Sequence, residues 1–310
     1  MADIRGNNSN NDLYGTDEDD RIVGLGGDDY LTGGFGGADK LFGGGGNDRI
    51  SFSHYDATDI DRMYGGDGVD AAYLWLGGET QDIVAQVGVS TVKVGGAHVL
   101  YLDSIEQFYD FELGSGNDRL VGGALSEFGY GNGGNDRLIG NGGADFLYGM
   151  SGDDVLFGND DNDKLDGGGG GDALLGGGGD DTLVGGADID RLTGGQGHDQ
   201  LTGDAGHDRF IWQSPDEGGD RITDFTPGQD LLLFASASFG GIAAVNDTNF
   251  VANSSGVAKD ADDRFLFSTG TKGLFFDADG NGAGAKVLIA HIDFVDPTHA
   301  VLNPSDFHLF

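Results

Sequence analysis

The chain has no cysteine and only four prolines among its 310 residues. Without cysteine, neither a disulfide framework nor thiol catalysis is possible. Glycine is abundant, at 62 residues, but it does not recur at every third position, so a collagen triple helix is excluded. Basic residues are also scarce, because 16 Lys and Arg stand against 53 Asp and Glu, for a formal net charge of −37. A surface of this sign repels nucleic acid and anionic lipid, and we expect neither as a partner.

Long apolar segments and catalytic motifs are absent as well. No run approaches the ~20 apolar residues that a membrane span needs, and the first residues contain no apolar core of a cleaved secretory signal. Neither the HExxH zinc motif nor the GxSxG nucleophile motif occurs. We therefore expect a protein that is not an enzyme, with catalysis in residues 52–112 or 212–310 as the open alternative.

The sequence does contain a repeat. Residues 131–211 divide without remainder into nine nonapeptides, each with Gly in the first place, Asp in the sixth and an apolar residue in the eighth. The sixth-place residues are Asp136, Asp145, Asp154, Asp163, Asp172, Asp181, Asp190, Asp199 and Asp208. The eighth-place residues are Leu138, Leu147, Leu156, Leu165, Leu174, Leu183, Leu192, Leu201 and Phe210. Such regularity argues against a flexible glycine-rich linker.

The spacing predicts a local structure. The first six places are rich in glycine, which allows the positive φ angles of a tight turn. The last three places can form only a very short strand, whose middle residue points inward. Two nonapeptides then make one coil of eighteen residues, and coils stack about 4.8 Å apart. Stacking aligns every second sixth-place aspartate, so the nine aspartates form two rows.

These rows predict bound metal. Two carboxylates held about 5 Å apart repel by roughly 3 kcal/mol at an effective dielectric constant near 20. Ca²⁺ reverses the sign, because it accepts six to eight oxygen ligands from carboxylates and backbone carbonyls. Consecutive aspartates of the two rows predict about seven Ca²⁺ sites in this array, each shared by two turns. Metal binding would then be part of the folding energy.

The repeat resembles the RTX (repeats-in-toxin) family, whose consensus is GGxGxDxUx. The resemblance implies an all-β, right-handed parallel β-roll that binds Ca²⁺. It also implies that one turn offers carbonyls from its first and third places, and the facing turn from its second and fourth, each together with Asp. Glycines that stand at such places are Gly168, Gly170, Gly177, Gly179, Gly195 and Gly197.

A shorter array precedes the main one. Over residues 15–51, four nonapeptides are interrupted by one extra residue, Gly33, which must bulge at a turn and disturbs the first pair of sites. The pairs across this array predict one or two further Ca²⁺ ions. The sixth-place residues are Asp20, Asp29, Asp39 and Asp48.

The remaining segments break the period. We predict a short roll over residues 1–63, a β segment over 64–112, the main roll over 113–211 and a β cap over 212–310. Asp118 restarts the count in the main roll, and the degenerate nonapeptide with Glu127 in the sixth place is interpreted as a spacer rather than a weak site. Asp277, Asp279 and Asn281 match the opening of an EF-hand loop. A tight hairpin turn is favoured there over an additional Ca²⁺ site.

Two further features concern location and partners. Residues 305–310, an acidic residue followed by hydrophobic ones, resemble the uncleaved C-terminal signal of type I secretion, which predicts an extracellular or cell-surface protein. In the main roll, one sheet is predicted to carry an outward apolar stripe, which we expect the C-terminal region or a second protomer to cover. Scattered surface hydrophobics are the alternative. The stripe consists of Ile139, Phe157, Leu175 and Ile211, with Thr193 between them.

These observations predict a secreted Ca²⁺-binding protein that folds when it binds the ion. Its role would be an extracellular structural or adhesive module, for instance in a surface layer or biofilm matrix. One alternative is a polysaccharide-binding module auxiliary to a carbohydrate-modifying enzyme. Another is a non-catalytic interaction or signalling protein that resembles the secreted nodulation-type RTX proteins.

Overall fold

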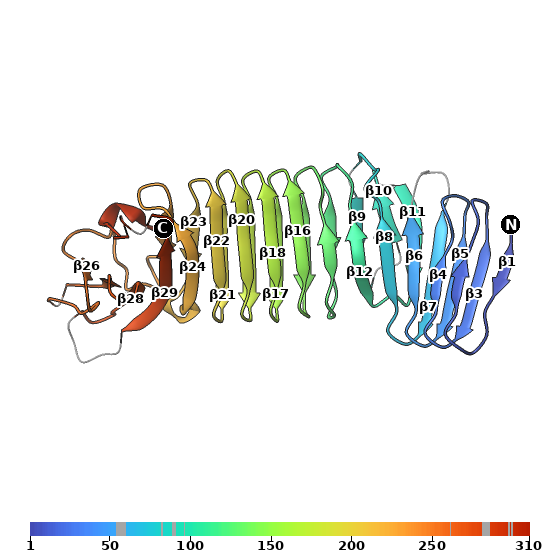
Figure 1. Cartoon of the computed structure of the whole chain (residues 1–310), viewed down its shortest axis with the longest axis horizontal. Helices are drawn as coiled ribbons and strands as arrows, with labels where there is room; N and C mark the ends of the chain where they lie inside the picture. The colour runs from blue at the N-terminus through green and yellow to red at the C-terminus, as the bar shows by residue number, and fades with distance from the viewer. Residues whose placement is uncertain are drawn as a thin grey trace. The chain divides into compact units, whose positions relative to one another are not determined.

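The computed structural model describes residues 1–53, 60–81, 83–88, 91–95, 97–260, 262–280, 286–296, 298 and 300–310. Within these ranges the regular structure is β, apart from short 3₁₀ turns that include η1 (Pro215–Glu217) and η3 (Pro304–Asp306). No helix in these ranges has the length and apolar character needed to cross a bilayer. The chain forms two compact units, an N-terminal unit (Met1–Leu156) and a C-terminal unit (Phe157–Phe310), coloured blue to green and green to red in Figure 1.

The N-terminal unit consists of two sheets that the chain visits alternately. Its sheet A has the order β1 (Asp3–Arg5), β3 (Arg21–Gly26), β5 (Lys40–Gly45), β7 (Asp61–Asp67), β11 (Ala97–Asp103), β10 (Thr91–Val94), β9 (Ile83–Gln86), β13 (Arg119–Val121) and β15 (Arg137–Asn141). Its sheet B has the order β2 (Asp12–Tyr14), β4 (Tyr30–Thr32), β6 (Arg49–Ser53), β8 (Ala71–Trp75), β12 (Gln107–Glu112), β14 (Phe128–Tyr130) and β16 (Phe146–Ser151).

Strand pairing in this unit follows the repeat. Leu120 of β13 lies opposite Leu138 of β15 in parallel, eighteen residues on, as the two-nonapeptide coil predicts. The extra Gly33 lengthens one coil, so that Ile22 pairs with Leu41 without loss of register. Between the arrays, β10 pairs in the antiparallel sense with both β9 and β11, while β7 and β13 continue the parallel pairing on either side. The irregular segment therefore adds strands to sheet A.

The C-terminal unit has the same two-sheet architecture and ends in a cap. The boundary between the units falls inside β17 (Val155–Asp160), which joins sheet A. Sheet A then contains β19 (Ala173–Gly178), β21 (Arg191–Gln196), β23 (Arg209–Trp212), β25 (Leu231–Phe234) and β30 (Phe307–Leu309). Sheet B contains β18 (Lys164–Gly169), β20 (Thr182–Ala187), β22 (Gln200–Ala205), β24 (Asp220–Phe225), β29 (Val287–Phe294), β28 (Gly273–Phe276), β27 (Phe265–Ser268) and β26 (Phe250–Asn253).

Two kinds of core fill the units. In the coils, the eighth-place residues of the main array are completely buried, as the pattern predicts. In the cap, the strands β28 and β29 form the predicted antiparallel hairpin, and a cluster of phenylalanines forms the core. Phe234 packs against Phe265 and Phe239, with ring centroids 4.9 and 5.0 Å apart. The parallel β-roll predicted from the repeats is thus confirmed.

The ninth-place residues are buried to a similar extent on both sheets. Ile139, Leu175 and Ile211 are half-buried, and so are Tyr148 and Val184 of the other sheet. The two faces therefore do not differ as a covered stripe would require, and the expectation of a partner over this stripe gains no support from burial.

Candidate metal centre

The sixth-place aspartates form hydrogen-bonded ladders along the coils. In the C-terminal unit, Asp181 Oδ1 accepts from the backbone N–H of Asp163 at 2.8 Å. The N–H of Asp181 in turn donates to Asp199 Oδ1 at 2.8 Å. The other row repeats this arrangement at Asp190, whose Oδ1 accepts from the N–H of Asp172 at 2.8 Å. One oxygen of each carboxylate thus links its coil to the coil eighteen residues earlier.

The second carboxylate oxygen has a different environment. In Asp181, Asp190 and Asp199 the Oδ2 atom is buried and has no hydrogen-bond donor. The same holds in the N-terminal unit for Asp29 and Asp48. Burial of a charged oxygen without a donor or a cation is strongly unfavourable. These oxygens are therefore the groups in the coils that a bound cation would stabilise.

The pKa values reflect this environment. Burial, reinforced by the neighbouring carboxylates of Asp199 and Asp163, raises the pKa of Asp181 to about 7. Burial likewise raises the pKa of Asp190 to about 6 and that of Asp208 to about 7. In the protein alone, the ionised form of these groups is disfavoured, and a dication beside them would restore it.

Backbone oxygens complete the surroundings. A side chain at Gly176 would collide with Asp181 Oδ2 and would also lie 2.6 Å from the carbonyl oxygen of Gly194, one coil on. Only glycine leaves this space open. The six glycines predicted to offer carbonyls all take positive φ, and the carbonyl oxygen of Gly177 faces Gly195 of the next coil. Their φ angles are 98° (Gly168), 121° (Gly170), 120° (Gly177), 135° (Gly179), 108° (Gly195) and 133° (Gly197).

This donor set fits Ca²⁺. Among the described residues, no group of three or more His, Cys, Asp or Glu side chains is placed to hold a metal ion by itself, so a metal here must take backbone carbonyls as well as carboxylates. Calcium accepts such all-oxygen sets with flexible geometry. Asp181 and Asp199, with carbonyls of the glycine-rich turns, would hold the ion, which would neutralise the buried carboxylates and cross-link successive coils.

Comparison with known proteins agrees with this chemistry. The family model of the RTX calcium-binding nonapeptide repeat matches residues 5–37, 36–52, 112–124, 130–165, 139–174 and 175–210. The protein is an RTX-type β-roll protein. Its repeats are of the calcium-binding kind, which makes it a Ca²⁺-binding repeat protein. A search of curated proteins returned no match.

All the predicted aspartates lie in the rows of the RTX roll. None of them is more than 3% exposed. In the N-terminal unit, Asp39 Oδ1 accepts from the N–H of Asp20 at 2.7 Å and Asp48 Oδ1 from that of Asp29 at 2.8 Å. The residues are Asp20, Asp29, Asp39, Asp48, Asp118, Asp136, Asp145, Asp154, Asp163, Asp172, Asp181, Asp190, Asp199 and Asp208. The number of ions that they bind stays a prediction.

Sequence reasoning missed several members of the ladders. Asp61 Oδ1 accepts from the N–H of Asp39 at 2.5 Å, 22 residues on. Asp70 is indicated by the sequence, as the sixth residue of a weak nonapeptide over residues 65–73, and its Oδ1 accepts from the N–H of Asp48 at 2.8 Å. Asp220 and Asp230 extend the two rows of the C-terminal unit in the same way. The fixed period hid them, because longer turns precede them. The tripeptide Asp-x-apolar, as in Asp220-Arg221-Ile222, is the signal that could have found them.

The N-terminal unit also begins with a coil that the nonapeptide count omitted. Gly6 and Asn11 stand at the first and sixth places of a nonapeptide with Asn instead of Asp, and the first residues matched by the family model include it. The N–H of Asn11 donates to Asp29 Oδ1 at 2.8 Å, so the ladder starts with an uncharged residue.

For Glu127 and for the turn with Asp277, Asp279 and Asn281, the sequence left metal binding open. Glu127 is fully buried, accepts from the N–H of Gly123 at 3.1 Å and donates its own N–H to Asp145 Oδ1 at 2.7 Å. Glu127 therefore occupies a ladder position, although its role as spacer or site stays a prediction. Asp277 Oδ1 accepts from the N–H of Asp279 at 3.2 Å, as in a tight turn, and Asn281 lies outside the described residues.

Proposed function

We propose that this protein is a secreted, non-catalytic RTX protein that folds on binding Ca²⁺ and serves as an extracellular structural or adhesive module. One observation carries the proposal. Asp181, Asp190 and Asp199 each bury a carboxylate oxygen that the protein gives no donor, and the carbonyl oxygen of Gly194 lies close to the space beside that of Asp181. A fold built around such groups depends on a cation from its surroundings.

The energetics support a role that begins outside the cell. A chain with 62 glycines loses much conformational entropy on folding, and its acidic composition opposes collapse. Ca²⁺ binding offsets both terms, so that binding energy becomes folding energy. Cytosolic calcium is scarce and extracellular calcium is plentiful. The chain would stay unfolded during export and fold on arrival.

The C-terminal segment supports export by a type I route. Residues 307–309 form β30, which pairs in parallel with β25, and Phe307 is buried. A segment that becomes a buried strand only on folding remains accessible in the unfolded chain. Removal of residues 305–310 is expected to abolish export from cells that carry a type I apparatus. Continued export of the shortened chain would overturn this part of the proposal.

A calcium titration tests the main proposal. Circular dichroism of the chelated protein should show a largely unfolded chain, and addition of Ca²⁺ should produce β structure in a cooperative transition. Mg²⁺, which demands stricter octahedral geometry, should substitute poorly. A chelated protein that retains its full β content at neutral pH would refute calcium-dependent folding.

A further inference from the structure

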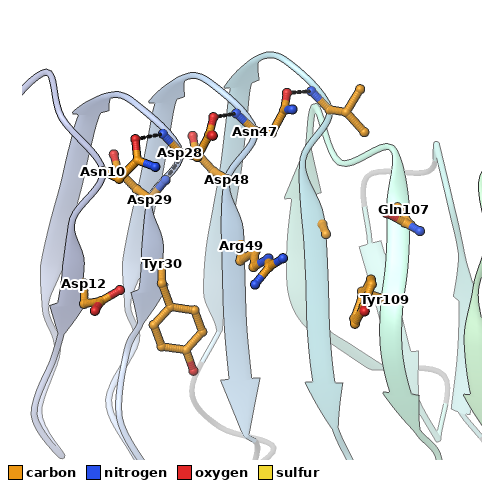
Figure 2. Close-up of a pocket in the computed structure, with 12 residues that line it drawn as sticks. Asn10, Asp12, Asp28, Asp29, Tyr30, Asn47, Asp48, Arg49, Gln107 and Tyr109 are labelled. Atoms are coloured by element: carbon orange, nitrogen blue, oxygen red, sulfur yellow. Dashed lines mark hydrogen bonds between the residues drawn. The ribbon is translucent and has the colours of Figure 1, made fainter.

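A row of partly exposed aromatic rings crosses sheet B of the N-terminal unit. The rings of Tyr73 and Tyr109 have their centroids 5.2 Å apart, those of Tyr109 and Phe128 5.6 Å, and those of Phe128 and Phe146 4.6 Å. Tyr109 is 41% exposed, and Tyr30 lies on the same face of the sheet (Figure 2). Aromatic residues in such numbers are not needed on a solvated sheet, and they are the residues that dominate binding surfaces.

Beside this row the surface is hollowed. Ala71 lies in register between Arg49 of β6 and Gln107 of β12, and its side chain is too short to fill the gap. Tyr30 and Arg49 stand on one side of it and Gln107 and Tyr109 on the other (Figure 2). The resulting Ala71 hollow has a volume of about 590 Å³, comparable with small-molecule sites.

A β-bulge forms one wall of the hollow. The register between β12 and β8 shifts between Phe108 and Asp110, so Tyr109 is the extra residue. The bulge directs the Tyr109 ring outward, where the guanidinium of Arg49 lies 6.0 Å from its centroid. Gln107 lies on the same strand as Tyr109, and its side-chain amide is held in place because its Nε2 donates to the carbonyl of Ser126. Bulges re-aim side chains in this way beside binding sites.

The rim of the hollow is polar and fixed. Asn10 Oδ1 accepts from the N–H of Asp28 at 2.9 Å, and Asp28 Oδ1 accepts from that of Asn47 at 2.8 Å (Figure 2). Asn47 Oδ1 then accepts from the N–H of Val69 at 3.0 Å. Each turn is thus tied to the next by a side chain. A ligand at this rim would not have to order it, which favours affinity.

We propose that the Ala71 hollow and the adjoining aromatic row bind a neutral, hydroxyl-rich polysaccharide. The flat rings of Tyr30 and Tyr109 suit the apolar face of a pyranose, and Arg49, Gln107 and Asp12 offer donors and acceptors to its hydroxyls. Strands about 4.8 Å apart present such groups at intervals close to the length of one sugar ring.

Charge selects this occupant over others. The chain carries a net charge of −37, and Asp12 and Asp28 border the hollow, so a polyanion is repelled. Asp29 and Asp48 also line the hollow, but they belong to the ladder, where bound Ca²⁺ would neutralise them. The remaining charges, Asp12, Asp28 and Arg49, nearly balance and give a polycation little to bind, so a neutral polymer is the expected occupant. The surface exists only in the folded roll, so the inference requires that Ca²⁺ folds the chain but does not depend on the route of secretion.

Affinity electrophoresis of the full chain in saturating Ca²⁺ tests the proposal. The neutral probes are hydroxyethyl cellulose, dextran, galactomannan and arabinoxylan; alginate and polylysine are the charged probes. At least one neutral polymer should retard the wild type. Tyr109→Ala, which removes a wall, and Ala71→Tyr, which fills the hollow, should each weaken retardation at least tenfold. Ala173→Tyr is the matched control, because it adds the same side chain at the same nonapeptide place of β19, and it should bind as the wild type does.

The outcomes separate the two proposals. A protein that does not gain β structure in Ca²⁺ refutes the proposed function. A folded protein that no neutral probe retards, that prefers alginate or polylysine, or that still binds after Ala71→Tyr overturns the polysaccharide site alone. Circular dichroism in Ca²⁺ checks each variant. If Tyr109→Ala does not fold, Arg49→Ala on the exposed side of the hollow takes its place, with the same expected loss.

Discussion

Within the C-terminal unit, the aspartates inside the ladders differ from those that end them. Asp190 has one oxygen bonded to a backbone N–H and another without a donor. Asp230, at the end of the same row, accepts from the N–H of Asp208 at 3.0 Å and from that of Thr226 at 2.7 Å. Asp220 ends the other row and accepts from the indole Nε1–H of Trp212 at 2.8 Å. The protein thus gives the second carboxylate oxygen a hydrogen-bond donor at the ends of the ladders but gives none to that of Asp190 inside.

In the N-terminal unit, Asp20 is likewise an aspartate whose second carboxylate oxygen has hydrogen-bond donors. Its Oδ2 accepts from both the N–H and the hydroxyl of Thr16, at 2.6 and 2.8 Å. Burial pushes the pKa of Asp20 up, but hydrogen bonds from Ala2 and Thr16 outweigh it and lower the pKa. A sixth-place aspartate therefore does not always leave its second oxygen without a donor. We expect metal binding to depend on whether the preceding turn gives that oxygen a donor.

The largest effect is expected from removing calcium. Chelation should unfold the coils between residues 158 and 211, because their carboxylates depend on the cation. The cap has a phenylalanine core, in which Phe234, Phe239 and Phe265 are fully buried, and this core does not depend on the cation. Strands β27 to β29 should therefore keep more protection against hydrogen exchange. Hydrogen exchange followed by mass spectrometry, with and without chelator, measures both. Equal loss of protection in the two regions would contradict the distinction.

A pair of substitutions sharpens the comparison. Asp190→Asn keeps a hydrogen-bond acceptor but removes a charge that two sites would share, so the calcium midpoint should rise at least tenfold. At saturating calcium the free energy of unfolding should fall by about 2–3 kcal/mol. Asp220→Asn should leave the midpoint within about twofold, because the indole Nε1–H of Trp212 already donates to Oδ2 of this carboxylate. Calcium titrations of both variants measure the two midpoints. Similar shifts of the midpoint would show that the aspartates at the ladder ends bind metal too.

The sequence could predict the interior better than the ends for a physical reason. The fixed period of Gly, Asp and Leu encodes the coil, so the inward position of Leu174 and the ladder position of Asp181 follow from counting. Trp212 and Thr226 act through single hydrogen bonds across longer turns, and no period reports them. The same applies to the Tyr109 bulge, which depends on the register of β12 against β8.

Acidification should weaken calcium binding and strengthen the metal-free roll. Burial raises the pKa of Asp181 to about 7 and that of Asp190 to about 6, whereas both titrate near 4 in an unfolded chain. Between pH 4 and 7 the metal-free fold thus binds more protons than the unfolded state, so its stability falls as pH rises. Calcium must displace these protons, so its midpoint should increase below about pH 7. Titrations at pH 5.5, 6.5 and 8 test this, and a constant midpoint would contradict it.

Trp212→Phe should leave Asp220, at the end of its ladder, with a buried oxygen that has no donor, like the aspartates inside the ladders. The substitution keeps a ring against Phe234, whose centroid lies 5.2 Å from that of Trp212, but removes the donor to Asp220 Oδ2. A buried oxygen without its donor costs about 1–3 kcal/mol in the free energy of unfolding. Denaturation in saturating calcium measures the loss. Trp75→Phe in the N-terminal unit is the control, because Trp75 is 39% exposed, and an equal loss there would refute the assigned role of the indole.

The smallest effect is expected at Met150, where strain comes from placing a methionine in a left-handed backbone conformation. Met150 occupies a second place, where the backbone has a positive φ of 77°, and its side chain is 46% exposed. A left-handed conformation costs an ordinary residue about 1–2 kcal/mol, and glycine's greater freedom in the unfolded chain returns part of that. Met150→Gly should therefore raise the free energy of unfolding by about 0.5–1 kcal/mol. Asn159, with φ 80° at the same place, tolerates this conformation, so Asn159→Gly should change little. Equal gains from the two substitutions in chemical denaturation would mean that the turn, and not the methionine, carries the strain.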